Sequence, residues 1–219
     1  MGAKGMWAVN ASMLAMLIVV NLALNLAGEA LWIALGLAAL AGGLFFCFRQ
    51  GMKLGHGACG ISNTVESARK AGDRVYAQLD RKYLAQAWSP ATGVKGVLLS
   101  ALIPYVSGGV YIILTLLYQS LPSLQGPVIL SRVIAWFLSL PYWPIIMHWH
   151  SDFVTLTPAI AAMLLISPFV MPLCTFAGYL QGPKLWQRSE DAMKQGLRRA
   201  KARARVGKKL APKIQKPEI

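Results

Sequence analysis

Residues 7–48 read WAVNASMLAMLIVVNLALNLAGEALWIALGLAALAGGLFFCF, and this stretch decides the fold. It is almost wholly apolar, and its clearest interruption is the pair Gly28-Glu29. At ~1.5 Å per residue it would make roughly 60 Å of helix, about twice the hydrocarbon thickness of one bilayer. The stretch therefore predicts two membrane spans, residues 8–27 and 30–48, paired as a tight antiparallel hairpin with a glycine stop between them.

The composition of the whole chain agrees with a membrane protein. Of its 219 residues, 56% are hydrophobic and only 14% are charged, whereas a soluble domain is about one quarter charged. A soluble globule and a disordered chain are therefore both disfavoured. The three cysteines are too few and too scattered for a disulfide scaffold.

Two further spans are predicted at residues 96–117 and 158–180, where apolar residues again run for about 20 positions. The segment 128–147 is ambiguous, because it contains Arg132 and is cut by Pro141 and Pro144. Before Pro141 it offers only about 13 helical residues, roughly 20 Å, which is too short to cross.

Charge decides how many times the chain crosses. The segment 49–95 has eight basic and three acidic residues, and the segment 184–219 has twelve basic and three acidic residues. Basic segments collect on the cytoplasmic side, so an even number of crossings should separate these two. We predict an all-α integral membrane protein with four transmembrane helices, an outer re-entrant or interfacial segment at 128–147 and amphipathic cytoplasmic helices. Both termini then lie on the cytoplasmic side of a plasma membrane or bacterial inner membrane.

This topology divides the chain into four parts: a transmembrane hairpin (1–48), a basic cytoplasmic loop (49–95), a C-terminal membrane region (96–182) and a basic cytoplasmic tail (183–219). Glycines in 49–63 predict a flexible loop. Asn63 and Glu66 resemble a capping box and predict that an amphipathic helix begins near Thr64 and ends near Ala87. That helix would lie on the inner leaflet or dock another protein.

The tail predicts a helix over 184–206 with a thin apolar stripe and many basic side chains. Each basic residue near an anionic leaflet contributes ~1 kcal/mol, so lipid contact is the favoured interpretation and a protein partner, such as another membrane subunit, the second. Nucleic acid or the ribosome is not expected, because no RNA-binding motif is present. The residues predicted to contact lipid or a partner are Arg198, Arg199, Lys201, Arg203, Arg205, Lys208 and Lys209.

Polar residues inside the predicted spans are few. Arg132 at the membrane centre would cost ~2.5–3.5 kcal/mol, so it should reach the outer surface or pair with Glu29 or Asp152; we favour the outer surface. Asn21 and Asn25 lie one turn apart and could hydrogen-bond to a facing helix. The small residues Ala34, Ala38 and Gly42 form a stripe on the second span, and Ala39 and Gly43 a neighbouring one; such stripes would allow close approach of a facing helix. The alternative to helix packing by these residues is a polar solute path lined by the asparagines.

One polar cluster, His148-Trp149-His150-Ser151-Asp152, is predicted on the outer side. On an extended chain His148, His150 and Asp152 share one face and could bind a metal ion, although an interfacial loop is the favoured interpretation. His56 and Cys59 lack a second ligand pair. No cofactor is predicted.

Motifs of hydrolases, zinc proteases and P-loop enzymes are missing from the sequence. The favoured function is therefore a non-catalytic accessory, scaffold or assembly component that acts through helix packing and its basic tail. The alternatives are a small transporter or channel subunit, and a metal-dependent membrane enzyme using His148, His150 and Asp152.

Overall fold

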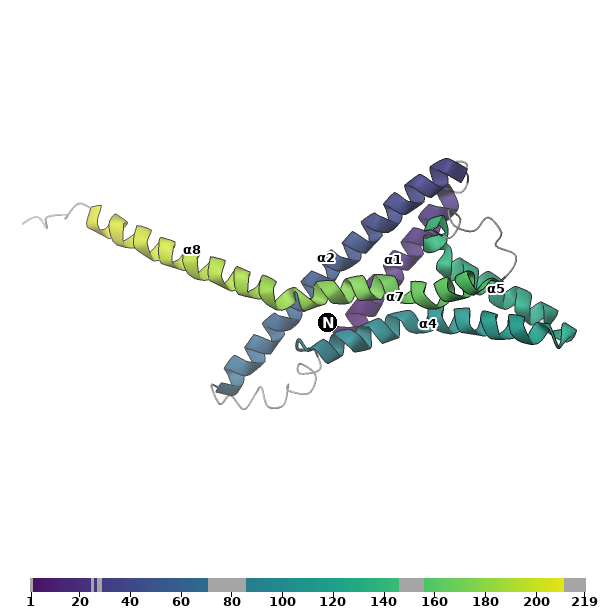
Figure 1. Ribbon diagram of the computed structural model, residues 1–219. Helices are drawn as coiled ribbons and strands as arrows, with labels where there is room; N and C mark the ends of the chain where they lie inside the picture. The colour runs from purple at the N-terminus through teal and green to yellow at the C-terminus, as the bar shows by residue number, and fades with distance from the viewer. Residues whose placement is uncertain (1, 25, 27–28, 71–85, 146–155, 211–219) are drawn as a thin grey trace, which may run out of the picture.

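The structure, a computed structural model, describes residues 2–24, 26, 29–70, 86–145 and 156–210. Every regular element in this part of the chain is helical. Five stretches are long and apolar enough to cross a membrane. The integral membrane character predicted from the composition is consistent with this architecture, shown in Figure 1.

Five long helices account for most of the structure: α1 (Gly2–Leu24), α2 (Glu29–Lys70), α4 (Pro90–Tyr118), α7 (Pro158–Leu180) and α8 (Gly182–Leu210). Three short elements follow α4 along the chain: the 3-10 turn η2 (Pro122–Leu124), helix α5 (Gln125–Ser139) and the 3-10 turn η3 (Leu140–Tyr142).

The directions of the long helices follow from contacts between them. Asn10 hydrogen-bonds to Ser100, and Gly96 faces Met6, so α1 and α4 run parallel. α7 lies between α2 and α4 and runs antiparallel to α4 (Figure 1). The start of α1, the start of α4 and the end of α7 therefore share one end of the bundle. We call it the basic end, because Lys4, Lys95 and Lys184 lie there.

Three buried clusters hold the bundle together. The first joins α1, α2, η3 and α7, the second joins the basic ends of α1, α2, α4 and α7, and the third joins α4, α5 and α7. Their buried members are Met13, Leu17, Leu40, Cys47, Tyr142 and Met171; Met6, Ala58, Val97 and Tyr179; and Tyr111, Ala135, Ile160 and Leu164.

Two predicted spans can be compared directly with the helices. α7 has the predicted bounds, 158–180. α4 begins at Pro90 instead of residue 96, because Ser89 caps it: the Ser89 hydroxyl accepts a hydrogen bond from the backbone N–H of Thr92 at 3.1 Å. Proline in the first turn of a helix loses no hydrogen bond, so the helix gains almost two turns.

The flexible loop predicted at 49–63 is wrong, because α2 continues unbroken through these residues to Lys70. Its glycines serve packing. A methyl group on Gly51 would overlap the carbonyl oxygen of Thr175, and one on Gly55 would overlap that of Tyr179. On α7 and α8, Gly178 and Gly182 meet α2 in the same way. The predicted helix start at Thr64 is wrong for the same reason, and residues 71–85 lie outside the described part.

The segment between α4 and α7 turns inside the bundle. α5 ends at Ser139, and η3 follows at once with Pro141 in its first turn. Tyr142 is buried among residues of α1, α2 and α7. Pro144 then lies against Gly36, two turns from the start of α2.

The tail helix is longer than predicted. Only Gln181 separates α7 from α8, and α8 continues through Gly207 to Leu210, whereas the sequence predicts an end near Val206. Figure 1 shows α8, in yellow, extending from the end of α7 away from the other helices.

Candidate functional site

A buried polar network joins three helices near the middle of the bundle. The Thr175 hydroxyl donates to the Asn10 side-chain oxygen at 2.6 Å, and the Asn10 side-chain amide donates to the Ser100 hydroxyl at 3.1 Å. The Ser100 hydroxyl in turn donates to the Gly96 carbonyl at 2.7 Å. Thr175 is fully buried and Asn10 almost so. The network links α1 to both α4 and α7.

A cavity of about 420 Å³ opens beside this network, between α1, α4, α5, η3 and α7. Most of its walls are apolar, and none of the lining side chains is charged. The polar side chains at its wall include Asn10, Ser100, Ser139 and Ser167. This is the region between the first span and the proline-containing segment where the sequence placed the alternative solute path.

Three prolines line the same cavity: Pro104, Pro168 and Pro172. A proline inside a helix has no N–H to donate to the carbonyl four residues earlier. The carbonyls that lose this partner belong to Ser100, Leu164 and Pro168, which also line the cavity. Three residues of the cavity wall therefore have a backbone carbonyl that lacks its usual helical donor.

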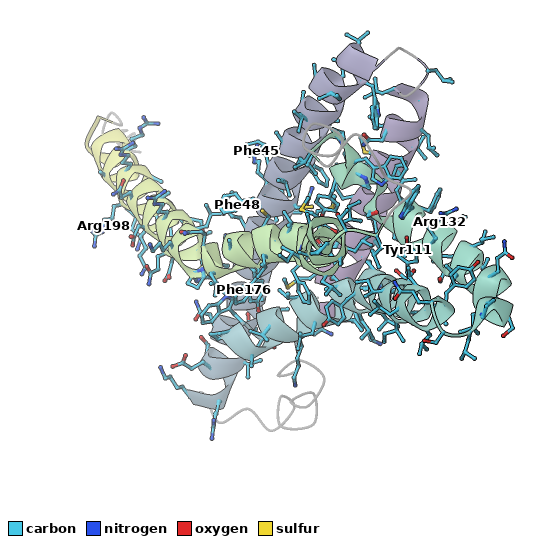
Figure 2. All side chains as sticks on the ribbon, turned by 45° about the vertical axis from the view of Figure 1, so that its right-hand side comes forward. Phe45, Phe48, Tyr111, Arg132, Phe176 and Arg198 are labelled. Carbon is cyan, nitrogen blue, oxygen red and sulfur yellow. The ribbon has the colours of Figure 1, made fainter. Side chains whose placement is uncertain are left out.

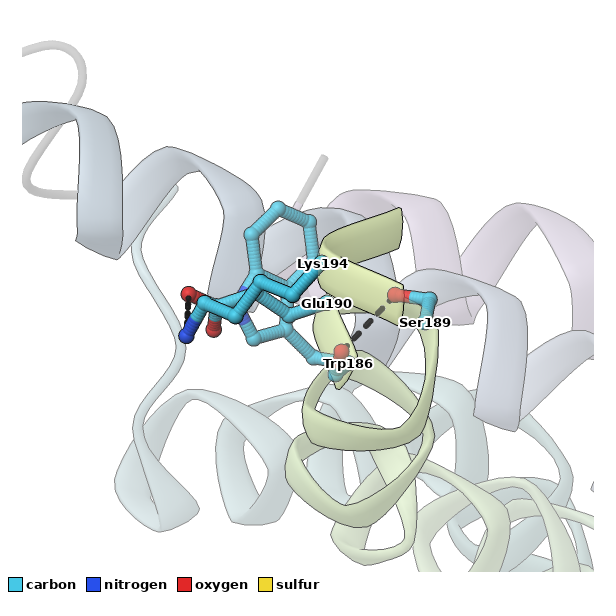
Figure 3. A network of polar contacts seen from close by, with 4 residues as sticks. All are labelled: Trp186, Ser189, Glu190 and Lys194. Atoms are coloured by element: carbon cyan, nitrogen blue, oxygen red, sulfur yellow. Dashed lines mark hydrogen bonds and ion pairs between the residues drawn. The ribbon is translucent and has the colours of Figure 1, made fainter. Parts of the chain in front are cut away.

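At the basic end, Trp186 fixes the start of α8 to α2. Its ring lies against Gly60 and 5.2 Å from the His56 ring, centroid to centroid. The His56 ring nitrogen and the Ser189 hydroxyl are 3.2 Å apart. Ser189 also donates to the Trp186 carbonyl at 2.7 Å, as Figure 3 shows. His56 thus makes packing contacts here and belongs to no metal-ligand group among the described residues.

A second aromatic contact closes the same end. The Trp88 ring stacks on Tyr179, and the Trp88 backbone N–H donates to the Ser62 hydroxyl at 3.0 Å. The Ser89 backbone N–H donates to the Tyr179 hydroxyl at 3.3 Å. The extension of α2, the start of α4 and the end of α7 are thereby joined.

Beyond Trp186 the side chains of α8 are mostly exposed. Met193 is 68% and Leu197 57% exposed. Glu190 and Lys194 form an ion pair along the helix at 2.9 Å (Figure 3). Four of the predicted contact residues are exposed: Arg198, Arg199, Lys201 and Arg203. The other three lie in α8, but their side chains are outside the described set: Arg205, Lys208 and Lys209.

Arg132 is half-buried on α5, with its guanidinium 5.4 Å from the centroid of the Trp136 ring. Trp136 in turn meets Trp143 edge-on. Figure 2 shows Arg132 and Arg198 on opposite sides of the molecule. The side chain of Glu29, and all of Asp152, lie outside the described residues, so the predicted pairing of Arg132 with either stays a prediction.

The intramembrane asparagines differ in their surroundings. Asn21 is buried, and its amide donates to the Leu17 carbonyl of its own helix at 2.9 Å, while its side-chain oxygen has no partner among the described residues. Asn25 lies outside the described residues, as do His148, His150 and Asp152. Asn10, by contrast, bonds across helices.

The small residues of α2 are divided between two faces. Gly36 and Gly43 face the α1 side, where Gly43 meets Met13 and Leu17. Of the two small-residue stripes predicted on this helix, Ala34, Ala38 and Gly42 are exposed, and a methyl group on Gly42 would meet nothing within 4 Å. The neighbouring stripe, Ala39 and Gly43, packs against the cluster that contains Met13 and Leu17 of α1. Close approach to the first span is therefore made by the second stripe and not by the first.

Two features of the site were missed in the sequence although their signals are present. Glycines four residues apart at 51 and 55, and again at 178 and 182, have the spacing of close helix pairs. Ser100 and Thr175 are hydroxyl residues within apolar spans, which are the partners that a buried asparagine needs.

Comparisons of the chain with known protein families, curated proteins and solved structures find no match.

Proposed function

We propose that this chain is a non-catalytic component of a membrane assembly, acting through helix packing and through the basic helix α8. In this proposal the chain crosses a cell membrane four times, with both termini on the cytoplasmic side. The segment 122–145 enters from the outer side and returns to it. α8 contacts the anionic lipids of the inner leaflet.

The observation that carries the proposal is the state of α8. Its first two turns are fixed to α2 by Trp186, yet Met193 and Leu197 further along are exposed. At 100° per residue, Met193, Leu197 and Ala200 lie on the same side of the helix as Trp186, and Arg188 and Arg199 lie on the opposite side. Arg203 lies on the apolar side. An exposed apolar stripe opposite basic side chains is the pattern of helices that lie on anionic membranes.

The four-crossing topology is supported by both ends of the segment 122–145. It begins next to the end of α4, and Pro144 contacts Gly36 near the start of α2. The end of α1, the start of α2 and the end of α4 all lie opposite the basic end. A segment whose two ends meet the same side has entered and returned, and Pro141 and Pro144 supply the turn. All basic residues except Arg132 then share one side, as basic cytoplasmic segments require.

The test compares two neighbouring positions on α8. Met193→Cys and Gln195→Cys are made separately, in a chain whose three native cysteines are replaced by alanine. Each carries a polarity-sensitive fluorophore, and the protein is placed in vesicles with or without anionic lipid. Residues two positions apart on a helix point about 200° apart, so the two probes face opposite ways.

The proposal predicts a blue-shifted emission at position 193 with anionic lipid, and a water-like emission at 195. In neutral vesicles, or in 1 M salt where the Debye length is about 3 Å, the probe at 193 should also emit as in water. Equal emission at both positions in anionic vesicles would contradict the membrane contact of α8.

A further inference from the structure

The cavity between α1, α4, α5 and α7 has a buried floor and an exposed apolar rim. On the floor, Leu164, Ser167 and Met171 are each under 5% exposed. At the rim, Val19, Ile103 and Phe137 are 66%, 59% and 50% exposed. Large apolar side chains exposed on membrane helices face lipid. The cavity therefore opens sideways toward the hydrocarbon of the bilayer.

Two serine hydroxyl groups in the wall of the cavity, those of Ser100 and Ser139, can accept hydrogen bonds from a ligand. The Ser139 hydroxyl already donates to the Trp136 carbonyl at 3.1 Å, and the Ser100 hydroxyl to the Gly96 carbonyl. Each hydroxyl oxygen has two lone pairs, and Asn10 already uses one of those on Ser100, so Ser139 can accept two hydrogen bonds and Ser100 one. The carbonyls of Ser100 and Pro168 lack a helical donor, because Pro104 and Pro172 have no N–H. A ligand that hydrogen-bonds to these oxygens must donate.

The ligand must also be neutral. None of the lining side chains is charged, and a charge at membrane depth without a counter-ion is costly. This excludes an ammonium donor and also an anionic phosphate or carboxylate head group. A hydroxyl group is the neutral donor that lipids commonly carry.

We infer that this cavity binds a neutral lipid with one hydrocarbon chain and a hydroxyl-bearing head group, which enters sideways from the bilayer. The inference rests on the lateral opening, the uncharged lining and the acceptors beside Pro104 and Pro172.

The size of the cavity fits a single chain. A volume of about 420 Å³ lies within the range of small-molecule sites. If a methylene group takes roughly the volume of a water molecule, about 30 Å³, the cavity holds on the order of a dozen methylene groups. That is one chain of a lipid.

Selectivity depends on the head group. Lipid tails are as apolar as the cavity walls, so a hydrocarbon chain gains little by leaving the bilayer for the cavity. Hydrogen bonds from the hydroxyl groups to Ser139 and to the released carbonyls distinguish the ligand from bulk lipid. A methyl ester with the same chain cannot donate and should bind weakly.

The experiment uses the full-length protein in lipid nanodiscs with a photoactivatable monoacylglycerol as the probe. Unlabelled monoacylglycerol and the methyl ester of the same fatty acid serve as competitors. Two matched pairs of variants are compared. Ala11→Phe fills the cavity, and Ala162→Phe makes the same change at an exposed position of α7 that does not line the cavity. Ser139→Ala removes a lining hydroxyl, and Ser131→Ala removes one on the same helix with the same kind of bond outside the cavity.

The expected result is saturable labelling that monoacylglycerol displaces at a concentration at least tenfold lower than the methyl ester does. Ala11→Phe should reduce labelling at least tenfold and Ala162→Phe should not. Ser139→Ala should weaken binding about three- to tenfold, with Ser131→Ala unchanged.

The inference is overturned by labelling that does not saturate, by equal competition from the methyl ester, or by equal labelling of Ala11→Phe and Ala162→Phe. If Ala11→Phe does not fold, as judged by thermal unfolding, the serine pair decides the matter: equal binding by Ser139→Ala and Ser131→Ala overturns the inference.

Discussion

Two asparagines of α1 illustrate how the same residue takes different roles at the residue scale. Asn10 accepts from Thr175 of α7 and donates to Ser100 of α4, so it joins three helices. Asn21 bonds only to the Leu17 carbonyl, and its side-chain oxygen has no partner in the described structure. The sequence identifies both as polar residues within a span. It does not identify their partners, because those depend on which helices cross at each level.

The interhelical bond between Asn10 and Thr175 should be measurable. Thr175→Val keeps the size of the side chain and removes the donor, so the free energy of unfolding should fall by about 1 kcal/mol. A double-mutant cycle with Asn10→Leu, measured by reversible unfolding in mixed micelles, should give a coupling energy of about 0.6–1.7 kcal/mol. The control is Ser107→Ala, whose hydroxyl bonds only within α4. A coupling energy of zero would mean that the bond contributes nothing.

Asn21→Leu should behave differently from Asn10→Leu. Removing a buried acceptor that lacks a partner relieves a desolvation cost, so Asn21→Leu should leave the free energy of unfolding unchanged or raise it. The same unfolding assay decides: a loss as large as that of Asn10→Leu would show that the Asn21 oxygen is bonded in the membrane.

At the scale of elements, glycine has two structural roles, in flexible loops and in closely packed helices, and composition alone does not distinguish them. The glycines of 49–63 look like a flexible loop when counted, but Gly51 and Gly55 lie one turn apart on a face of α2 that contacts α7. The apolar runs predicted the helices, and α7 has the limits of the apolar run at 158–180. The continuation of α2 beyond Phe48 was not predicted. This second part of α2 is stabilised by contacts with α7 and α8, which lie far away in the sequence.

Gly51 and Gly42 should therefore respond with opposite sign to one substitution. Gly51→Ala places a methyl group against the Thr175 carbonyl, and overpacking of this kind costs about 1–3 kcal/mol. Gly42→Ala meets open space and should gain up to about 1 kcal/mol from helix propensity. Thermal unfolding in detergent should show a lower Tm for the first and an equal or higher Tm for the second. Equal shifts would contradict the close packing of α2 on α7.

At the scale of the whole molecule, the outward face of α2 is a second surface that fits the proposed assembly. Small residues are enriched where membrane helices approach one another closely, yet Ala34, Ala38 and Gly42 are exposed here.

The candidate site could be predicted from the sequence only in part. Arg132 and the basic tail stand out by charge, whereas the cavity depends on how α1, α4, α5 and α7 meet.

If another membrane helix packs on the face of α2 formed by Ala34, Ala38 and Gly42, Gly42→Leu should release that helix. Gly109→Leu makes the same change on α4, where a methyl group also meets nothing within 4 Å. On native gels of gently solubilised membranes, the wild type should migrate as a large complex and Gly42→Leu as a smaller species. Gly109→Leu should migrate like the wild type. Identical migration of all three would exclude this face as the contact.

In the proposed topology the chain crosses four times, with the segment 122–145 returning to the outer side. Single cysteines at Ser123, Ser151 and Gln195, in a chain without native cysteines, can be tested in intact cells with a membrane-impermeant thiol reagent. Four crossings predict labelling at 123 and 151 and none at 195. Labelling at 123 and 195 with protection at 151 would mean five crossings, with α8 outside the cell, and would contradict the proposed topology.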